Sequence, residues 1–394
     1  MMIKQDDLYW SLIYEFVTRH EYQIIRLSDD GREILLDPYR NKDFQIVRLI
    51  RMELDWGSQL QQDIEKTAAQ IDHIRKQSWK HPIQILNIYI SSYPPVDDWE
   101  FRIERPHQYG QTTLKSIVID KEKDHESVLF LEKLLHVPLT FPSENEFLNT
   151  QELKRKAISY SNRRIKEEKQ IFHFGKPIFT YLFTAIQVFM FMLLEASGGS
   201  QNTETLVQFG AKYNPFIIDG EWWRFITPVF LHIGMLHLLM NTLALVYIGG
   251  AVERMYGSAK FLFIYLFAGA AGSLASFALS PSISAGASGA IFGCFGALLY
   301  LGISNPKLFF RTIGSNLFFI IGLNLLFGFA VPNIDNAGHI GGLLGGFLAA
   351  LIVQLPKQNK WGLRLAGIVL SLIFIIAAYT YGFQFAEIID TNAK

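Results

Sequence analysis

The chain has 394 residues, with 36 Lys or Arg and 36 Asp or Glu, so that its formal net charge is zero. After residue 176, however, only 10 of these basic and 8 of these acidic residues remain. The first part of the chain therefore has the composition of a soluble domain and the second that of a membrane domain. No strongly basic domain stands out, which argues against nucleic acid as a partner.

The sequence argues against an internal disulfide and against a cleaved signal peptide. Cys294 is the only cysteine, so the chain holds no internal disulfide. The first residues, MMIKQDDLYWSLIYEF, lack a basic region followed by an uninterrupted apolar stretch. We therefore expect no cleaved signal peptide.

Residues 1–150 predict a cytosolic α+β or α/β domain of unknown role. Apolar and polar residues alternate, which predicts strands at 22–27, 32–37, 44–50, 83–90 and 114–120. Helices are expected at 57–79 and 125–136. The histidines of this part have no metal-ligand spacing (His20, His73, His81, His107, His125 and His136). A site built from distant histidines, or another unknown ligand or partner, stays open.

Residues 151–176 predict a basic linker helix that leads directly into apolar sequence. The stretch ELKRKAISYSNRRIKEEK (152–169) favours contact with the anionic lipids of the cytoplasmic leaflet. A solvated connector helix explains the same composition, so both interpretations stand.

Seven apolar segments follow, each of about the 20 residues that a bilayer requires: 177–195, 229–249, 259–279, 286–303, 308–330, 336–354 and 363–384. Basic residues gather in alternate loops (Arg254 and Lys260; Lys307 and Arg311; Lys357, Lys360 and Arg364). Because positive loops stay inside, we expect a cell-membrane protein with a cytoplasmic N-terminus. The short tail at 385–394 then lies outside.

Polar side chains occur inside three of these segments, and each is a functional candidate because it is costly in hydrocarbon. The second segment holds His232, His237 and Asn241, the fourth begins near Ser288, and the sixth near His339. With the expected orientation all three segments run from outside to inside. Their polar residues therefore reach a similar depth in the outer part of the bilayer.

The spacing of these residues predicts a chemical site. His237 and Asn241 are four residues apart and share a helix face. Small residues follow Ser288 and His339 at helical spacing (Gly289 and Gly293; Gly342 and Gly346), so the two helices can approach closely. Ser288 would then meet His339, the usual base for a hydroxyl nucleophile. Donors for the developing oxyanion would be His237, Asn241 and the Ser288 amide.

Three other interpretations fit these residues less well. GASGA (286–290) alone is a helix-packing motif more often than a nucleophile, and it does not fit the G-x-S-x-G elbow of α/β-hydrolases. His232, His237 and His339 could form a zinc site, but Ser288 and Asn241 would then have no role. A transporter would need paired intramembrane carboxylates or an inverted repeat, and neither is visible.

Taken together, four motifs resemble the rhomboid intramembrane serine proteases: the GASG serine, AGHIGG (337–342), the H-x4-H-x3-N run and EWWRF (221–225). The resemblance covers residues 177–384, about half of the chain. It implies a six-helix bundle, here followed by a seventh helix, with the α+β domain in front. It also implies transmembrane protein substrates, membrane lipids as surroundings, and no metal or other cofactor.

The resemblance assigns roles by motif. Ser288 would be the nucleophile and His339 the general base and acid, with His237 and Asn241 in the oxyanion hole. Gly286, Gly289, His232, Gly342 and Gly346 would support the site, and Phe292 would pack against the His339 ring. Trp223 and Arg224 would lie in a loop at the membrane interface, where interfacial anchoring explains them equally.

Charged residues near the second and sixth segments also bear on the resemblance. Glu253 and Arg254 are interpreted as a structural ion pair. Asp335 lies in a loop four residues before His339, so a dyad without a third, acidic member is expected. The competing hypothesis is a catalytically silent relative that binds the transmembrane helices of client proteins.

Overall fold

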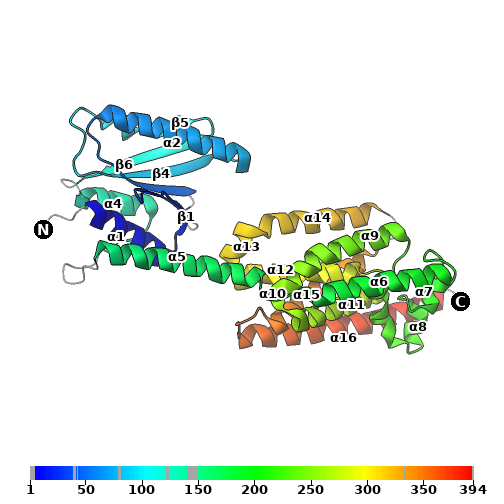
Figure 1. Ribbon diagram of the computed structural model, residues 1–394. Coiled ribbons are helices and arrows are strands. Elements are labelled where there is room, and N and C mark those ends of the chain that lie inside the picture. The colour runs from blue at the N-terminus through cyan, green and yellow to red at the C-terminus, as the bar shows by residue number, and fades with distance from the viewer. Residues whose placement is uncertain are drawn as a thin grey trace. The chain divides into compact units, whose positions relative to one another are not determined.

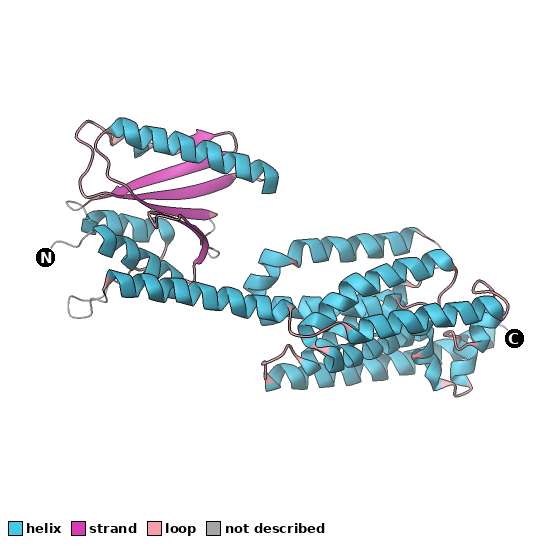
Figure 2. Cartoon of the chain, in the orientation of Figure 1, coloured by secondary structure: helices cyan, strands magenta, loops and turns pink. Residues whose placement is uncertain are grey.

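The computed structural model describes residues 5–38, 41, 43–78, 81–120, 124–139, 149–331 and 334–392. The chain divides into two compact units, Met1–Lys166 and Glu167–Lys394. The named strands all belong to the first unit, and the second consists of helices and loops (Figure 2).

The first unit is built on a mixed six-stranded sheet. Its order is β1 (Gln23–Leu27), β2 (Glu33–Asp37), β3 (Ile46–Arg51), β4 (Ile83–Ile90), β6 (Thr112–Ile119) and β5 (His107–Tyr109). The central strands β3, β4 and β6 are parallel, and the outer pairs are antiparallel. Because both faces of a parallel sheet are covered, β4 reads as a nearly continuous apolar run, IQILNIYI.

Helices cover both faces of this sheet (Figure 1). Helix α2 (Gly57–Ser78) lies on one face, and α1 (Gln5–Thr18), α4 (Asp124–Leu135) and α5 (Thr150–Phe172) lie on the other. A four-residue helix, α3 (Phe101–Glu104), precedes β5. The strands and helices expected here lie within about two residues of their predicted bounds. Helix α1 and strand β5 were not predicted.

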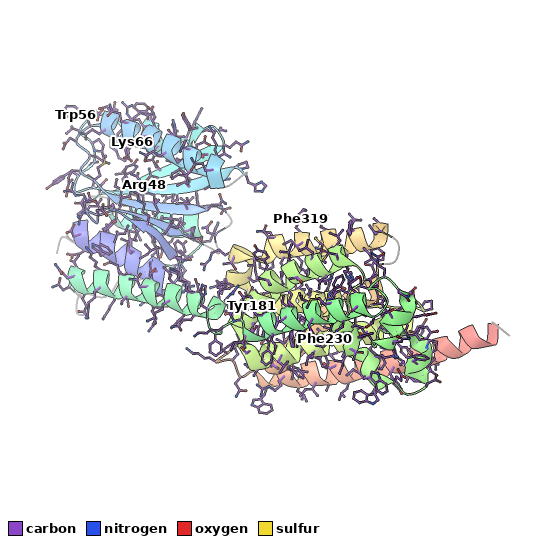
Figure 3. The ribbon with its side chains drawn as sticks, turned by 45° about the vertical axis from the view of Figure 1, so that its right-hand side comes forward. Arg48, Trp56, Lys66, Tyr181, Phe230 and Phe319 are labelled. Carbon is purple, nitrogen blue, oxygen red and sulfur yellow. The ribbon has the colours of Figure 1, made fainter. Side chains whose placement is uncertain are left out.

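One buried cation joins the sheet to α2. Arg48 of β3, labelled in Figure 3, is 4% exposed and binds Glu33 at 2.6 Å and Asp63 at 2.7 Å. The Tyr89 hydroxyl donates to the same Asp63 carboxylate at 2.7 Å. A buried guanidinium is tolerated only when it is paired and hydrogen-bonded in this way.

The second unit is a helical bundle with these elements: α6 (Ile178–Ala196), α7 (Thr203–Gln208), α8 (Asn214–Ile218), η2 (Trp222–Phe225), η3 (Thr227–Phe230), α9 (Met235–Ala244), η4 (Leu245–Gly249), α10 (Gly250–Tyr256), α11 (Ser258–Leu279), α12 (Ser288–Ser304), α13 (Pro306–Thr312), α14 (Gly314–Ala330), α15 (Asn336–Val353) and α16 (Trp361–Asn392). Five spans in the described residues are long and apolar enough to cross a membrane: α6, α9 to α10, α11, α15 and α16. Helix α12 is apolar but shorter, at 17 residues.

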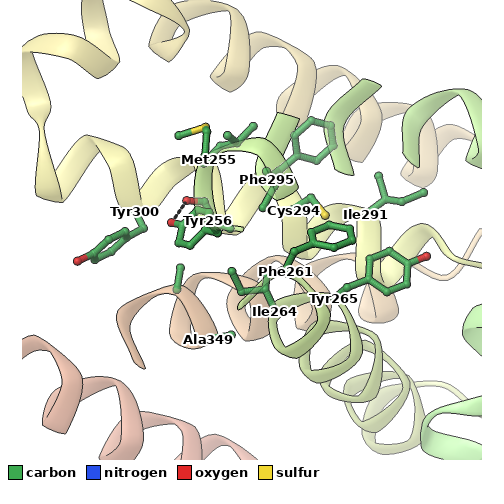
Figure 4. Packing of buried hydrophobic residues seen from close by; sticks show 14 of the residues in the cluster. Met255, Tyr256, Phe261, Ile264, Tyr265, Ile291, Cys294, Phe295, Tyr300 and Ala349 are labelled. Atoms are coloured by element: carbon green, nitrogen blue, oxygen red, sulfur yellow. Dashed lines mark hydrogen bonds between the residues drawn. The ribbon is translucent and has the colours of Figure 1, made fainter. Parts of the chain in front are cut away.

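The surface of this bundle is apolar, as contact with lipid requires. Tyr181 on α6 is 58% exposed and Phe319 on α14 is 69% exposed, and both side chains lie on the outside of the bundle (Figure 3). The interior is formed by α11, α12 and α15. Figure 4 shows part of it, where aromatic and aliphatic side chains of α11 pack against α12 (Phe261, Ile264 and Tyr265; Ile291, Cys294 and Phe295).

The structure changes the bounds of three predicted membrane segments: the second, the fifth and the last. The second helix begins at Met235 rather than at 229, because Gly234 adopts φ +78° and residues before it form η3 and a loop. The fifth segment is two helices, α13 and α14, which meet at an angle of 67°. At that bend a Cβ on Gly314 would lie 2.9 Å from the Phe309 ring. The last helix continues to Asn392, into the stretch expected as a tail.

The predicted ion pair between Glu253 and Arg254 is replaced by a different interaction. The buried Glu253 carboxylate of α10 accepts hydrogen bonds from the backbone amides of Ile178, Phe179 and Thr180, at 2.8–2.9 Å. The Thr180 hydroxyl donates to it as well, at 2.7 Å. These amides are the unpaired donors at the start of α6, where the helix dipole also favours a negative charge. Glu253 therefore fixes the first membrane helix to α10.

We expect the substitution Glu253→Ala to lower the free energy of unfolding by about 3 kcal/mol, because three backbone N–H groups and the Thr180 hydroxyl lose a buried, charged acceptor. Chemical unfolding in detergent micelles measures this loss. Glu204→Ala, at an exposed position on α7, is the control and leaves stability unchanged within about 0.5 kcal/mol. Equal stability of the two variants would contradict the capping role.

Candidate active site

Ser288 is the first residue of α12, and glycine determines how the chain reaches it. Gly286 has φ +151°, a backbone conformation that side chains rarely adopt. The His237 ring also lies against it, so that a Cβ at this position would be 2.7 Å from Cε1 of His237. Two constraints therefore require glycine at position 286: the backbone conformation and the close contact with the His237 ring.

The half-buried Ser288 lines a narrow cavity with about 20 Å³ of room, enough for about one water molecule. Its walls come from the loop before α12, from η3 and α11, and from the start of α15 (Pro228, Val229, Gly269, Gly272, Ser273, Ser284, Gly286, Gly289, Asp335 and Gly338). The cavity therefore lies where the start of α12, which carries Ser288, meets α11 and the start of α15, which carries His339.

His339 lies in the first turn of α15, and its ring stacks on Phe292 with a centroid distance of 4.3 Å and an angle of 9°. The predicted contact between these rings is present. Phe292 is one turn after Ser288 on α12, so the stacking holds the imidazole on the face of α12 that carries the serine. Among the described residues no hydrogen bond joins Ser288 Oγ to His339, and the buried Nδ1 of His339 has no partner. Catalytic hydrogen bonds often tighten only when substrate binds.

Glycines bring α12 and α15 into backbone contact. A Cβ on Gly342 would collide with the carbonyl oxygen of Gly289, and one on Gly346 would collide with that of Gly293. These are the pairs that the sequence placed on facing helices. Sequence reasoning missed the third partner, Gly272 of α11, where a Cβ would lie 2.7 Å from the Gly338 oxygen. The signal was present in the small-residue run AGAAGS (268–273).

The second span contributes His237 and, one turn later, Asn241. The Ile233 amide donates to Nδ1 of His237 at 3.4 Å, which leaves Nε2 to carry the proton in the neutral ring. This Nε2 is 3.0 Å from the place of a Cβ on Gly286. The Asn241 side chain donates to the His237 carbonyl at 2.9 Å, so one of its two N–H groups is occupied.

His232 precedes the helix that carries His237 and Asn241. It is fully buried in the loop before α9, and its Nε2 accepts the Ala287 amide at 3.4 Å. Its ring meets the His237 ring edge to face, with centroids 5.4 Å apart. His232 therefore supports the turn that precedes Ser288. In the described part of the chain, no group of three or more His, Cys, Asp or Glu is placed to hold a metal ion.

Arg224 differs from the interfacial anchor that was expected. It is 4% exposed, and its Nη1 donates to the carbonyls of Val207 and Ala211 at 2.8 and 2.9 Å. Glu221 balances its charge at 2.5 Å. The guanidinium therefore turns inward, toward the carbonyls in the last turn of α7 and just after it. Trp223 stays 43% exposed, as an interfacial aromatic residue would.

Asp335 occupies the N-cap of α15, where its carboxylate accepts the Gly338 amide at 2.9 Å. This bond fixes the turn that leads to His339, while the carboxylate itself caps the helix.

The site thus consists of a serine, an imidazole held by an aromatic ring, and donors from α9, all within an apolar helical bundle.

Comparisons with known proteins agree with this arrangement. A family model described as "Rhomboid domain" matches residues 219–356. The chain is 44% identical over 383 residues to "Rhomboid protease GluP" of Bacillus subtilis (strain 168), covering 95% of this chain and 74% of that protein. It is 35% identical over 151 residues to "Putative rhomboid protease YdcA" of the same organism, covering 38% of this chain and 76% of that protein. "RHOMBOID-like protein 2" of Arabidopsis thaliana is 37% identical over 164 residues, 41% of this chain and 51% of that protein.

These findings define a multi-pass membrane protein of the intramembrane serine protease class. The chain belongs to the rhomboid family, whose substrates are transmembrane proteins. It is an intramembrane serine endopeptidase, as the motifs predicted.

We expect Gly342→Ala to lower the rate of cleavage of a transmembrane substrate at least tenfold, since the added methyl group pushes α15 away from Gly289. The same overpacking should cost about 1–3 kcal/mol in unfolding free energy. Gly362→Ala on α16 is the matched control, because a Cβ there meets nothing within 4 Å. Wild-type cleavage by the Gly342 variant would show that the close approach is dispensable.

Proposed function

We propose that Ser288 is the nucleophile and His339 the general base and acid of this endopeptidase. The observation that carries the proposal is the backbone contact of α12 with α15, together with the stacking of His339 on Phe292. It puts the imidazole on the serine's own helix face, beside a cavity that both helices line. A hydroxyl is a weak nucleophile until a base takes its proton, and His339 is the base in reach.

The reaction follows from these groups. Ser288 Oγ attacks the scissile carbonyl carbon while its proton passes to the His339 imidazole. The C–N bond then breaks, and the amine leaves with that proton, which gives an ester between Ser288 and the substrate. Water enters, gives a proton to His339 and attacks the ester. The acid product leaves, and Ser288 recovers its proton from His339.

The oxyanion that forms during each attack needs preorganised donors. We assign this role to the Ser288 amide, the Nε2–H of His237 and the second side-chain N–H of Asn241. The supporting observation is the position of His237 against Gly286, two residues before the serine. Donors in an apolar surrounding are worth more than in water, because no solvent competes for them. His232, Gly286, Gly289, Gly342 and Gly346 hold this geometry.

Substrate helices would enter from the lipid, on the side that α14 covers. This helix buries only Gly314, Leu317, Ile321 and Gly328, and its junction with α13 is bent. It therefore has less packing to lose than α11, α12 or α15 when it moves. The substrate would unwind near its extracytoplasmic end, where water can reach the cavity.

The orientation and the domain roles rest on charge. The distribution of Lys and Arg supports a cytoplasmic N-terminus and an extracytoplasmic C-terminus. Near the end of α5, Lys166 and Lys169 would face anionic lipids, whereas Lys154 packs on Trp10 and Arg164 binds the Glu21 carbonyl within the first unit. In this division residues 177–384 carry catalysis, 151–176 link the parts, and 1–150 recruit substrates or bind a ligand.

The catalytically silent alternative has no supporting observation, since both Ser288 and His339 are present.

We expect Ser288→Ala to reduce cleavage of a model transmembrane substrate by about 10⁴-fold or more, because no other group replaces the nucleophile. A fluorophosphonate probe should label the wild type but neither Ser288→Ala nor His339→Ala. Ser371→Ala on α16, another buried serine, is the control and keeps both labelling and cleavage. Undiminished cleavage by the Ser288 variant would refute the assignment.

A further inference from the structure

A fully buried lysine lies in the loop between the first two spans. Lys212 has no exposed surface, and its Nζ donates to the carbonyls of Ser280 and Ser282 at 2.7 and 2.8 Å. Its backbone pairs with Ser284, with N···O distances of 2.9 and 3.1 Å. Lys212 thus contacts the segment 280–284 through both its side chain and its main chain. A buried ammonium is costly, so a structural need must maintain it.

The segment that Lys212 holds leads directly to the nucleophile. Residues 280–287 connect the end of α11 to Ser288, and the two residues closest to Ser288 form hydrogen bonds with the segment that precedes α9. The Gly286 amide donates to the Pro228 carbonyl at 2.9 Å, and the Ala287 amide donates to His232. Lys212 holds the part of the segment that follows α11, and these two bonds hold the part that precedes Ser288.

Neighbouring residues reinforce this arrangement. The Asn214 side chain donates to the carbonyls of Phe277 and Ser280 at the end of α11. On the other side Arg224 binds the Ala211 carbonyl, next to Lys212. Ser282 is different, because among the described residues its carbonyl accepts only from Lys212. The lysine is therefore the member of this network that fixes the middle of the segment.

We propose that Lys212 is a positioning residue for the catalytic serine, which holds the 280–286 segment so that Ser288 and its amide keep their catalytic geometry. The proposal rests on the assignment of Ser288 as nucleophile. Lys212 touches neither substrate nor the reacting atoms. It acts through the chain, and a shift of about 1 Å at Ser288 is enough to cost about 100-fold in rate.

The charge of Lys212 makes this role dependent on pH. Burial lowers the pKa of Lys212 from its ordinary value of 10.5 to about 8, and the negative charge of Asp335 at the start of α15 opposes this shift. In the same loop Arg224 and Glu221 pair with each other. Above about pH 8 the neutral amine keeps one N–H for each of the two carbonyls but loses the charge that strengthens both bonds, so we expect turnover to fall.

Stability should change in the opposite direction. Between about pH 8 and 10.5 the unfolded chain holds the Lys212 proton and the folded chain does not. The contribution of this group to stability therefore rises with pH in that window. A fall in turnover without a fall in stability distinguishes loss of positioning from unfolding.

The experiment compares the full-length protein with Lys212→Met, which keeps the length of the side chain and removes its donors. In proteoliposomes at about pH 7, kcat should fall by about 10- to 100-fold while KM changes less than about twofold. The rate of fluorophosphonate labelling at Ser288 should fall with kcat. The matched control is Lys260→Met, since Lys260 Nζ also binds a backbone carbonyl, that of Gln354, at 2.8 Å. Gln354 follows the end of α15, whereas the start of this helix lines the Ser288 cavity.

The outcomes separate the two proposals. Wild-type kcat in Lys212→Met, or an equal loss in Lys260→Met, overturns the positioning role. A loss of kcat that follows a drop in the thermal midpoint overturns it too. If Lys212→Met does not fold, the wild-type pH profile decides, and turnover that stays constant from about pH 7 to 9 overturns the role. Cleavage that persists in Ser288→Ala instead refutes the proposed nucleophile, whatever Lys212 does.

Discussion

The contact of three helix backbones at glycine is the constraint on which the rest of this membrane domain depends. Gly289, Gly342 and Gly272 place α12, α15 and α11 so close that a single Cβ would meet backbone atoms. Without water, helices in lipid associate through such contacts rather than through burial of apolar surface. The same contact decides the chemistry, because it determines where a serine and an imidazole on different helices can meet.

Buried charges then complete the backbone hydrogen bonding at the helix ends. Glu253 accepts the free amides of α6, Arg224 donates to carbonyls after α7, and Lys212 donates to those after α11. Within or near a membrane an unpaired backbone group costs several kcal/mol, and a charged partner satisfies several at once. The ion pair suggested for Glu253 with Arg254 is therefore replaced by hydrogen bonds to backbone amides, and the Arg224 guanidinium binds backbone carbonyls and Glu221 inside the protein.

The sequence was sufficient for features that depend on local pattern. Strand alternation in 83–90, the apolar segments and the helical spacing of Ser288 with Phe292 all follow from periodicity. It was not sufficient where a distant partner decides. The 67° bend after α13, the burial of His232 and the bonds of Lys212 each depend on a chain segment that spacing does not reveal. The roles of the site residues remain proposals that rest on their motif and geometry.

The stacking of His339 on Phe292 has a consequence for how such a site can diversify. Glycine backbone and the Phe292 ring form much of the surroundings of Ser288 and His339, the groups proposed as catalytic, so few neighbouring residues can be exchanged without moving them. A soluble protease can alter its preference by replacing residues around its nucleophile. In this protein evolution would instead have to change residues at the periphery, in α14 and the loops outside the bundle, while the residues around Ser288 and His339 stay nearly unchanged. New substrates would then be acquired through changes in access rather than in the catalytic pocket.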